Sequence, residues 1–225
     1  MFPISNAVRL IAAGVAMTAG AAHAAAGDWT VRSGAVWVVP DESTANARGP
    51  RADDGTLTGS TVAVDNELQL GLTVSYALTE HLAVELLAAT PFTHALHIEG
   101  GALDGASLGE VEQLPPTLSL QYHFRPGAQL QPYVGFGLNA TLMLDDSVGA
   151  DARAIGVREI SVDDSFGLAG QIGADWLLGG GWLLNADARV IDIDTTASVR
   201  MDDGTTRVDV DLDPWVLAIG VGYRF

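Results

Sequence analysis

The chain contains no cysteine, which excludes disulfide bonds and thiolate metal sites. Beyond the N-terminal segment it also has no uninterrupted apolar stretch of the roughly 18 residues that a spanning helix needs, so an α-helical inner-membrane protein is not expected. Basic residues are scarce: 11 Lys and Arg stand against 28 Asp and Glu, a formal net charge of -17. Because nucleic-acid binding requires a basic surface, this balance argues against a nucleic-acid partner.

The N-terminal residues have the pattern of a secretory signal peptide. Arg9 is the first charged residue, and residues 10–22 form an uncharged, mostly apolar run. Ala22-His23-Ala24 then supplies a small-residue cleavage site. We therefore expect residues 1–24 to be removed and residues 25–225 to form one domain; an uncleaved N-terminal anchor is the alternative.

The C-terminal segment alternates between two kinds of side chain. One face carries Trp215, Leu217, Ile219, Val221, Tyr223 and Phe225, and the other carries small residues and Arg224. A strand with one wholly apolar face and aromatic residues at both ends suits a wall between lipid and a polar lumen better than it suits a soluble sandwich.

The same period of two recurs along the chain and predicts eight strands. The strands are expected at Trp29–Val39, 68–78, Leu82–Ile98, 117–124, Gln131–Leu144, 165–178, Trp182–Thr196 and 215–225. Short connections at 79–81, 125–130 and 179–181 alternate with long, acidic ones at 40–67, 100–111, 145–164 and 197–211. The pattern predicts an all-β fold: an eight-stranded antiparallel up-and-down transmembrane β-barrel with short periplasmic turns and long extracellular loops.

Alternation also predicts which side chains face lipid and which face the lumen. Trp37, Phe92 and Trp215 are expected in an outer aromatic girdle, and most other aromatics in a periplasmic one. Tyr133 is the exception, because its position in the alternation turns it inward.

Five ordered blocks of the sequence resemble the OmpW family. They are Val84–Phe92 (VELLAATPF), Leu114–Leu118 (LPPTL), Gln131–Gly135 (QPYVG), Asp192–Ala197 (DIDTTA) and Leu212–Val216 (LDPWV). The resemblance implies a porin-like, eight-stranded barrel in the outer membrane of Gram-negative bacteria, with a narrow, largely apolar lumen linked to passage of small hydrophobic molecules. It also implies that Trp215, Tyr223 and Phe225 serve as girdle and as signal to the barrel assembly machinery.

The resemblance further implies an apolar constriction, for which Leu87 and Arg189 are the candidate residues. Leu87 keeps an apolar inward side chain, whereas Arg189 stands where better-known members have a bulky aromatic. A cation beside Leu87 would make the middle of the lumen less apolar.

Inward charges of both signs are expected at Arg32, Glu85, Asp175, Asp187, Arg189 and Arg224. An eight-stranded barrel is only wide enough for side chains or one small ligand, so opposite charges should pair there. This predicts an ion-pair plug in the lower lumen, with a polar conduction path as the alternative.

Three prolines fall at one height on two neighbouring strands. Pro91 lies near the outer end of one strand, and Pro115 and Pro116 near the outer start of the next. Because proline cannot donate to a ladder, the strands could part there and form a seam through which an apolar solute leaves sideways into lipid. Alternatively, the prolines simply end the strands at the rim.

Signals for catalysis or cofactor binding are weak. The G-x-S-x-G motif at Gly105–Gly109 lacks the strand before it and the helix after it that a nucleophile elbow requires. Asp192 and Asp194 offer too few carboxylates for a Ca²⁺ shell. We therefore expect no enzyme activity, no cofactor and no metal site.

Two functions remain open from the sequence. The first is a monomeric barrel that lets small hydrophobic solutes past the lipopolysaccharide leaflet and releases them sideways into outer-membrane lipid. The second is a plugged barrel that acts through its acidic extracellular loops as a receptor, adhesin or stress-related structural protein.

Overall fold

The computed structural model describes residues 25–39, 42–48, 61–64, 66–100, 104–105, 107–154, 156–202 and 204–225. The expected signal peptide, residues 1–24, lies outside the described residues. Among the helices that are described, none has the length and apolar character to cross a membrane.

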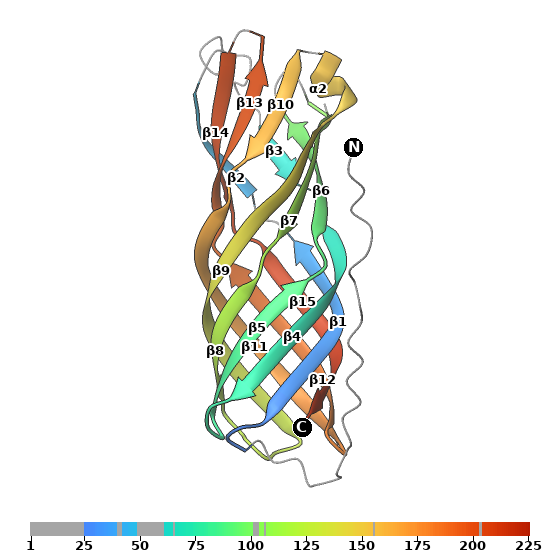
Figure 1. The fold of residues 1–225 in the computed structure, drawn as a ribbon, viewed down its shortest axis with the longest axis vertical. Helices are drawn as coiled ribbons and strands as arrows, with labels where there is room; N and C mark the ends of the chain where they lie inside the picture. Colours follow the sequence, from blue (N-terminus) through green and yellow to red (C-terminus); the bar gives the residue numbers. More distant parts are fainter. Residues whose placement is uncertain are drawn as a thin grey trace, which may run out of the picture.

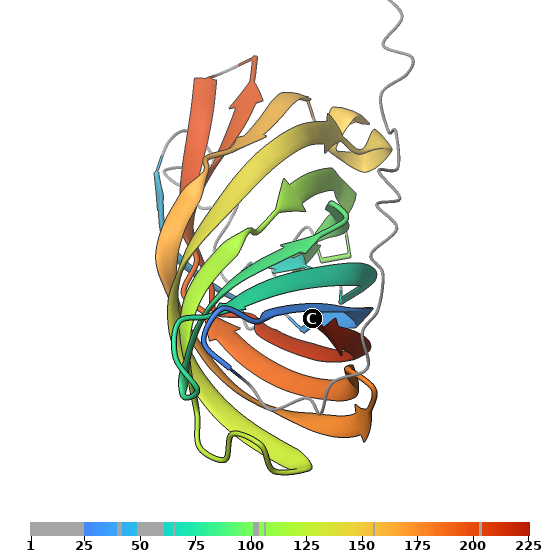
Figure 2. The same ribbon diagram turned by 60° about the horizontal axis from the view of Figure 1, so that its bottom comes forward.

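Eight antiparallel strands close into a barrel (Figures 1 and 2). In ring order they are β1 (Trp29–Val39), β4 (Glu67–Ala77), β5 (Leu82–Ala89), β8 (Thr117–His123), β9 (Leu130–Val148), β11 (Ser165–Gly179), β12 (Trp182–Ile191) and β15 (Trp215–Arg224). Pairing of β15 with β1 and of β9 with β11 completes the ring. The eight-stranded barrel expected from the period-two pattern is therefore confirmed.

The strands are steeply staggered. Following paired residues once around the ring from Trp29 leads to Val39, which is 39 − 29 = 10 residues further along the same strand. The path runs through Tyr76, Val84, Leu120, Phe136, Gly170, Val190 and Trp215. A barrel of this size has an interior that side chains fill.

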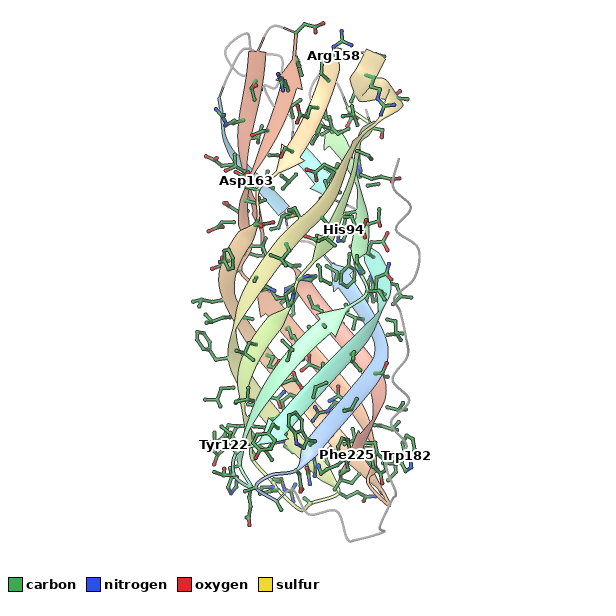
Figure 3. All side chains as sticks on the ribbon, in the orientation of Figure 1. His94, Tyr122, Arg158, Asp163, Trp182 and Phe225 are labelled. Carbon is green, nitrogen blue, oxygen red and sulfur yellow. The ribbon has the colours of Figure 1, made fainter. Side chains whose placement is uncertain are left out.

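The outer surface is apolar, with aromatic rings grouped near the periplasmic end (Figure 3). Ring pairs there are Trp29 with Tyr76, Tyr122 with Phe124, and Trp182 with Tyr223, at centroid separations of 4.9, 5.2 and 5.2 Å. Trp215 and Phe225 are also exposed on this outer surface. The arrangement matches an interfacial aromatic girdle.

The long extracellular connections contain strands of their own. These are β2 (Glu42–Arg48), β3 (Thr61–Val64), β6 (Phe92–Glu99), β7 (Ser107–Leu114), β10 (Val157–Val162), β13 (Asp194–Met201) and β14 (Gly204–Leu212), with the short helix α2 (Ala150–Ala154). Figure 1 shows them extending above the ring. Ladder pairing satisfies the backbone groups of these hairpins, so polar sequence there does not prevent strand formation. Ser107 of the G-x-S-x-G motif therefore lies on β7 and not on a strand-to-helix turn.

Phe92 is buried, and the expectation that it faces lipid is wrong. β5 turns its odd-numbered residues inward, as Leu87 shows, whereas β6 turns its even-numbered ones inward, including Phe92 and His94. The two strands are interrupted at Thr90 and Pro91. An irregularity of this kind moves the side chains that follow it to the opposite face.

Candidate functional site

The structure brings together all six inward charges in the lower half of the lumen. Arg32, Glu85, Asp175, Asp187, Arg189 and Arg224 are each at most 7% exposed. Three guanidinium groups face three carboxylates, so the fully ionised cluster has no net charge. Balanced pairing is what makes burial of so many charges tolerable.

Arg32 forms the centre of this network. Its Nε and Nη2 donate to the two carboxylate oxygens of Asp175 at 2.9 and 2.6 Å. Its Nη1 donates to Glu85 Oε2 at 3.1 Å and to Ser75 Oγ at 2.6 Å. The bidentate geometry with Asp175 fixes the guanidinium across the lumen.

Arg189 spans the barrel from one wall to the other. Its Nε donates to Asp187 Oδ1 and its Nη2 donates to Glu85 Oε1, each at 2.6 Å. Glu85 lies on β5 and Arg189 on β12, which are four strands apart in either direction around the ring. This ion pair therefore crosses the full width of the lumen.

Two neutral side chains, Tyr133 and Asn185, complete the network. Tyr133 Oη donates to Asp187 Oδ2 at 3.1 Å, and Asn185 Nδ2 donates to Asp175 Oδ1 at 2.9 Å. Strand alternation identifies both as inward, but their partners depend on the stagger of the barrel. Towards the periplasm, Arg224 Nη2 donates to Gln131 Oε1 at 3.1 Å and lies 3.8 Å from Asp175 Oδ2.

Inward glycines make room for two long inward side chains, Tyr133 and Gln171. A Cβ atom built on Gly173 would lie 2.5 Å from both Cζ and Oη of Tyr133. A Cβ atom on Gly135 would lie 2.6 Å from Nε2 of Gln171. Each glycine therefore lets a long side chain from the neighbouring strand lie flat across it.

Gly173→Ala is expected to lower the free energy of unfolding by about 1–3 kcal/mol, because the added methyl group displaces Tyr133 from Asp187. Urea titration of the barrel folded in lipid vesicles measures the loss. Gly170→Ala on the same strand is the matched control, since nothing lies within 4 Å of the built Cβ. Equal free energies of unfolding for the two variants would show that the close approach of Tyr133 to Gly173 does not contribute to stability.

An apolar layer lies directly above the ion network. It consists of Val36, Val38, Phe92, Ala169, Ile191, Ile193 and Val216. Ile191 follows Arg189 by two residues on β12, so the two side chains occupy the same inner face at successive levels. The described lumen thus changes from ionic to apolar along its axis.

Leu87 lies where the two layers meet and is 5% exposed. It lines a cavity of about 20 Å³, together with Arg32, Gly34, Gly71, Asn185 and Gly220. That volume accommodates roughly one water molecule. Arg189 is not among the residues that line this cavity; its guanidinium reaches Glu85, two residues before Leu87 on β5.

The three prolines flank an interruption in the ladder between neighbouring strands. β5 pairs with β8 up to Leu87 opposite Thr117, and β6 pairs with β7 from Phe92 onward. In the described ladder, residues 88–91 do not pair with 114–116. The interruption therefore lies beside Phe92 and at the level of the apolar layer.

Asn139 holds one side of this interruption in place. Its Nδ2 donates to the carbonyl oxygens of Pro115 and Pro116, both at 3.3 Å, and to Thr117 Oγ1 at 2.9 Å. The proline segment is thereby attached to β9 and not to β5. The unpaired stretch of backbone therefore lies between the proline segment and β5.

Carboxylates gather at the extracellular rim. Partial loss of hydration and the nearby Asp192, Asp211 and Asp213 raise the pKa of Asp194. Higher up, hydrogen bonds from Arg158 to Asp202, at 3.0 and 2.9 Å, lower the pKa of that carboxyl (Arg158 is labelled in Figure 3). Across the described ranges, no group of three or more His, Asp or Glu side chains is arranged to hold a metal ion.

A closed antiparallel barrel with an apolar outer surface, aromatic girdles and a polar lower lumen is an outer-membrane β-barrel. The sequence profile of the OmpW family matches residues 25–225, and the chain belongs to that family. Its location is accordingly the bacterial outer membrane.

Individual relatives agree with this assignment. Outer membrane protein W of Vibrio cholerae is 39% identical over 201 residues, covering 88% of this chain and 89% of that protein. The crystal structure of OprG from Pseudomonas aeruginosa matches with a TM-score of 0.82 and 40% identity, covering 89% of this chain and 97% of that one. A dibenzothiophene metabolism operon protein, PahQ of Pseudomonas aeruginosa, is 27% identical over 198 residues, 88% of each chain.

Proposed function

We propose that this barrel lets small hydrophobic molecules cross the outer membrane, entering from the extracellular side and leaving sideways into lipid between β5 and β8. The observation that carries the proposal is the position of the ladder interruption. It lies beside the apolar layer and directly above the ion network. A solute in the apolar layer would thus have the ladder interruption, and lipid beyond it, to one side and the ion network below it.

The ion network opposes an axial route to the periplasm. An apolar solute moving downward would have to separate Arg189 from Glu85 and Arg32 from Asp175. Breaking buried pairs leaves uncompensated charges in a medium of low dielectric, at a cost of several kcal/mol. The lateral route requires only that side chains such as Phe92 move, since the adjoining backbone segments do not pair.

The relatives support a hydrophobic solute. PahQ is named for an operon of dibenzothiophene metabolism, and dibenzothiophene is an apolar aromatic compound. Lipopolysaccharide slows such compounds, so a protein that bypasses the outer leaflet would supply them to the cell. Surrounding lipid and lipopolysaccharide are the partners that this function requires, and a single barrel suffices for it.

Leu87→Trp is expected to abolish the protein-dependent uptake of dibenzothiophene, because the larger side chain fills the narrow level at the foot of the seam. The measurement is the initial rate of uptake by cells that produce the variant, compared with cells that lack the barrel. Leu86→Trp is the matched control, since Leu86 is 47% exposed on the outer surface. Uptake that Leu87→Trp leaves unchanged would contradict passage through the lumen.

A second function, in which the extracellular strands bind a partner, is favoured by one observation. Buried side chains line the described lumen at both the ionic and the apolar level, and the cavity lined by Leu87 and Arg32 has a volume of only about 20 Å³. A barrel that never opens would act through its acidic outer surface as a receptor, adhesin or stress-related structural protein. Wild-type uptake equal to that of cells without the barrel, together with partner binding that depends on residues 194–212, would favour this alternative.

A further inference from the structure

Two buried side chains at the top of the ion network keep polar atoms that have no partner within the described part of the chain. Arg189 uses Nε and Nη2 for its two carboxylates, while Nη1 has no acceptor. Gln171 has no partner for either Nε2 or Oε1. Arg189 is 3% exposed and Gln171 is 7% exposed, so bulk water does not solvate these atoms.

These two side chains are neighbours on the inner wall. Gln171 and Arg189 are register partners on β11 and β12. Side chains at directly opposite positions on one face of a sheet have Cβ atoms roughly 5 Å apart, within reach of one small group. Gln171 lies across Gly135, and on the far side of that glycine Gln121 Nε2 also has no partner in the described chain.

The polar shelf formed by Gln171 and Arg189 lies immediately below the apolar layer. Ala169 precedes Gln171 by two residues on β11, and Ile191 follows Arg189 by two on β12. Both Ala169 and Ile191 belong to the apolar layer. A molecule in that layer would therefore have its lower end against the shelf.

A buried amide without a partner lowers stability, and methionine would fill a similar volume without that cost. The unpaired atoms of Gln171 are thus poorly explained by packing. They are suited to a group that arrives and leaves. Arg189 Nη1 and Gln171 Nε2 can donate hydrogen bonds to such a group, while Gln171 Oε1 can accept one.

Charge limits what that group can be. The three arginines and three carboxylates of the network already balance, so an added anion would bring an uncompensated charge into the lumen. A hydroxyl group is neutral, donates one hydrogen bond and accepts others. Its oxygen can accept hydrogen bonds from Arg189 Nη1 and Gln171 Nε2, and its proton can be donated to Gln171 Oε1.

We propose that Gln171 and Arg189 bind the hydroxyl group of amphipathic solutes such as alkanols and phenols, whose apolar part occupies the layer above. The inference rests on the proposed function for its biological meaning. It narrows the solute class from any hydrophobic molecule to apolar molecules that carry one neutral hydroxyl head.

The binding test uses side-chain amide NMR of the full barrel in lipid nanodiscs, with 1-octanol, octane and octanoate as probes. The Gln171 amide signal is assigned by its loss in Gln171→Met. We expect octanol to shift this signal in a saturable manner, and octane and octanoate to leave it unmoved. A shift by octanoate stronger than that by octanol, or no shift by octanol, would overturn the proposal.

The transport test measures uptake of octanol relative to octane by cells that produce wild type, Gln171→Met or Gln129→Met. Gln129 is an exposed residue of a periplasmic turn and serves as the matched control. We expect Gln171→Met to lower the octanol-to-octane ratio about three- to tenfold, as loss of one hydrogen bond implies, and Gln129→Met to leave it unchanged. Where wild type takes up octanol faster than cells without the barrel, an unchanged ratio in Gln171→Met would overturn the proposal.

The two tests separate this inference from the proposed function. Octanol binding at Gln171 with no uptake of any solute would sustain the shelf and reject transport. Equal uptake of octane and octanol with no shift at Gln171 would sustain transport and reject the shelf. Gln171→Met removes an unpaired amide, so it is expected to fold and to resist urea at least as well as wild type.

Discussion

Arg189→Met is expected to lower the free energy of unfolding by about 3–5 kcal/mol, the cost of removing one partner from a buried ion pair. The variant leaves Asp187 without a cation and Glu85 with only Arg32. The loss arises from the uncompensated carboxylate more than from the missing contacts. Urea titration in lipid vesicles, followed by fluorescence of the five tryptophans, measures it.

The double variant Asp187→Asn with Arg189→Met is the control for that explanation. It removes one charge of each sign and leaves Arg32 paired with both Glu85 and Asp175. We expect the double variant to be more stable than Arg189→Met alone, although it carries one more substitution. A double variant that loses the sum of the two single effects would show that the charges act independently, contrary to a coupled network.

Strand alternation was sufficient to predict the barrel and the inner face. Positions such as Arg32 and Asp175 are 143 residues apart, yet the period of two turns both inward. An eight-stranded ring brings inward groups from different walls within reach of one another, so opposite charges meet. For this reason the six charged residues could be predicted to lie together from sequence alone.

The partners of neutral residues could not be predicted in the same way. Tyr133 meets Asp187 because a stagger of ten residues brings their levels together and Gly173 leaves space for the ring. The sequence of a single strand reveals neither the stagger of the barrel nor which glycine will face a long side chain on the neighbouring strand. The unpaired atoms of Gln171 depend on the same three-dimensional fit.

The extracellular part differs most from the strands predicted from sequence, for two physical reasons. Ladder pairing satisfies the backbone groups of β7, β10 and β14, strands whose polar side chains obscure the period of two in the sequence. The interruption at Thr90 and Pro91 reverses which residues face inward, so the Phe92 side chain lies in the lumen.

A disulfide across the seam is expected to stop protein-dependent uptake of dibenzothiophene. Ala89→Cys with Pro115→Cys places the two thiols at the next inward positions beyond Leu87 and Thr117, the last pair of the β5–β8 ladder. The natural chain has no cysteine, so no other disulfide can form. The covalent link holds the two segments together, and the expected lateral exit cannot open.

A second pair of cysteines, on the opposite side of the barrel, controls for effects of disulfide formation itself. Ala186→Cys with Ile219→Cys joins β12 and β15 where the ladder is continuous. Its oxidation should leave uptake at the wild-type rate, because no passage is expected between those strands. Mass spectrometry of the purified barrels establishes that each disulfide has formed.

The most direct measurement is therefore uptake by cells with the seam disulfide oxidised and then reduced. Lateral release predicts that oxidation lowers the rate to that of cells without the barrel and that reduction restores it, while the β12–β15 pair responds to neither treatment. Uptake at the wild-type rate through the oxidised seam would contradict lateral release between β5 and β8.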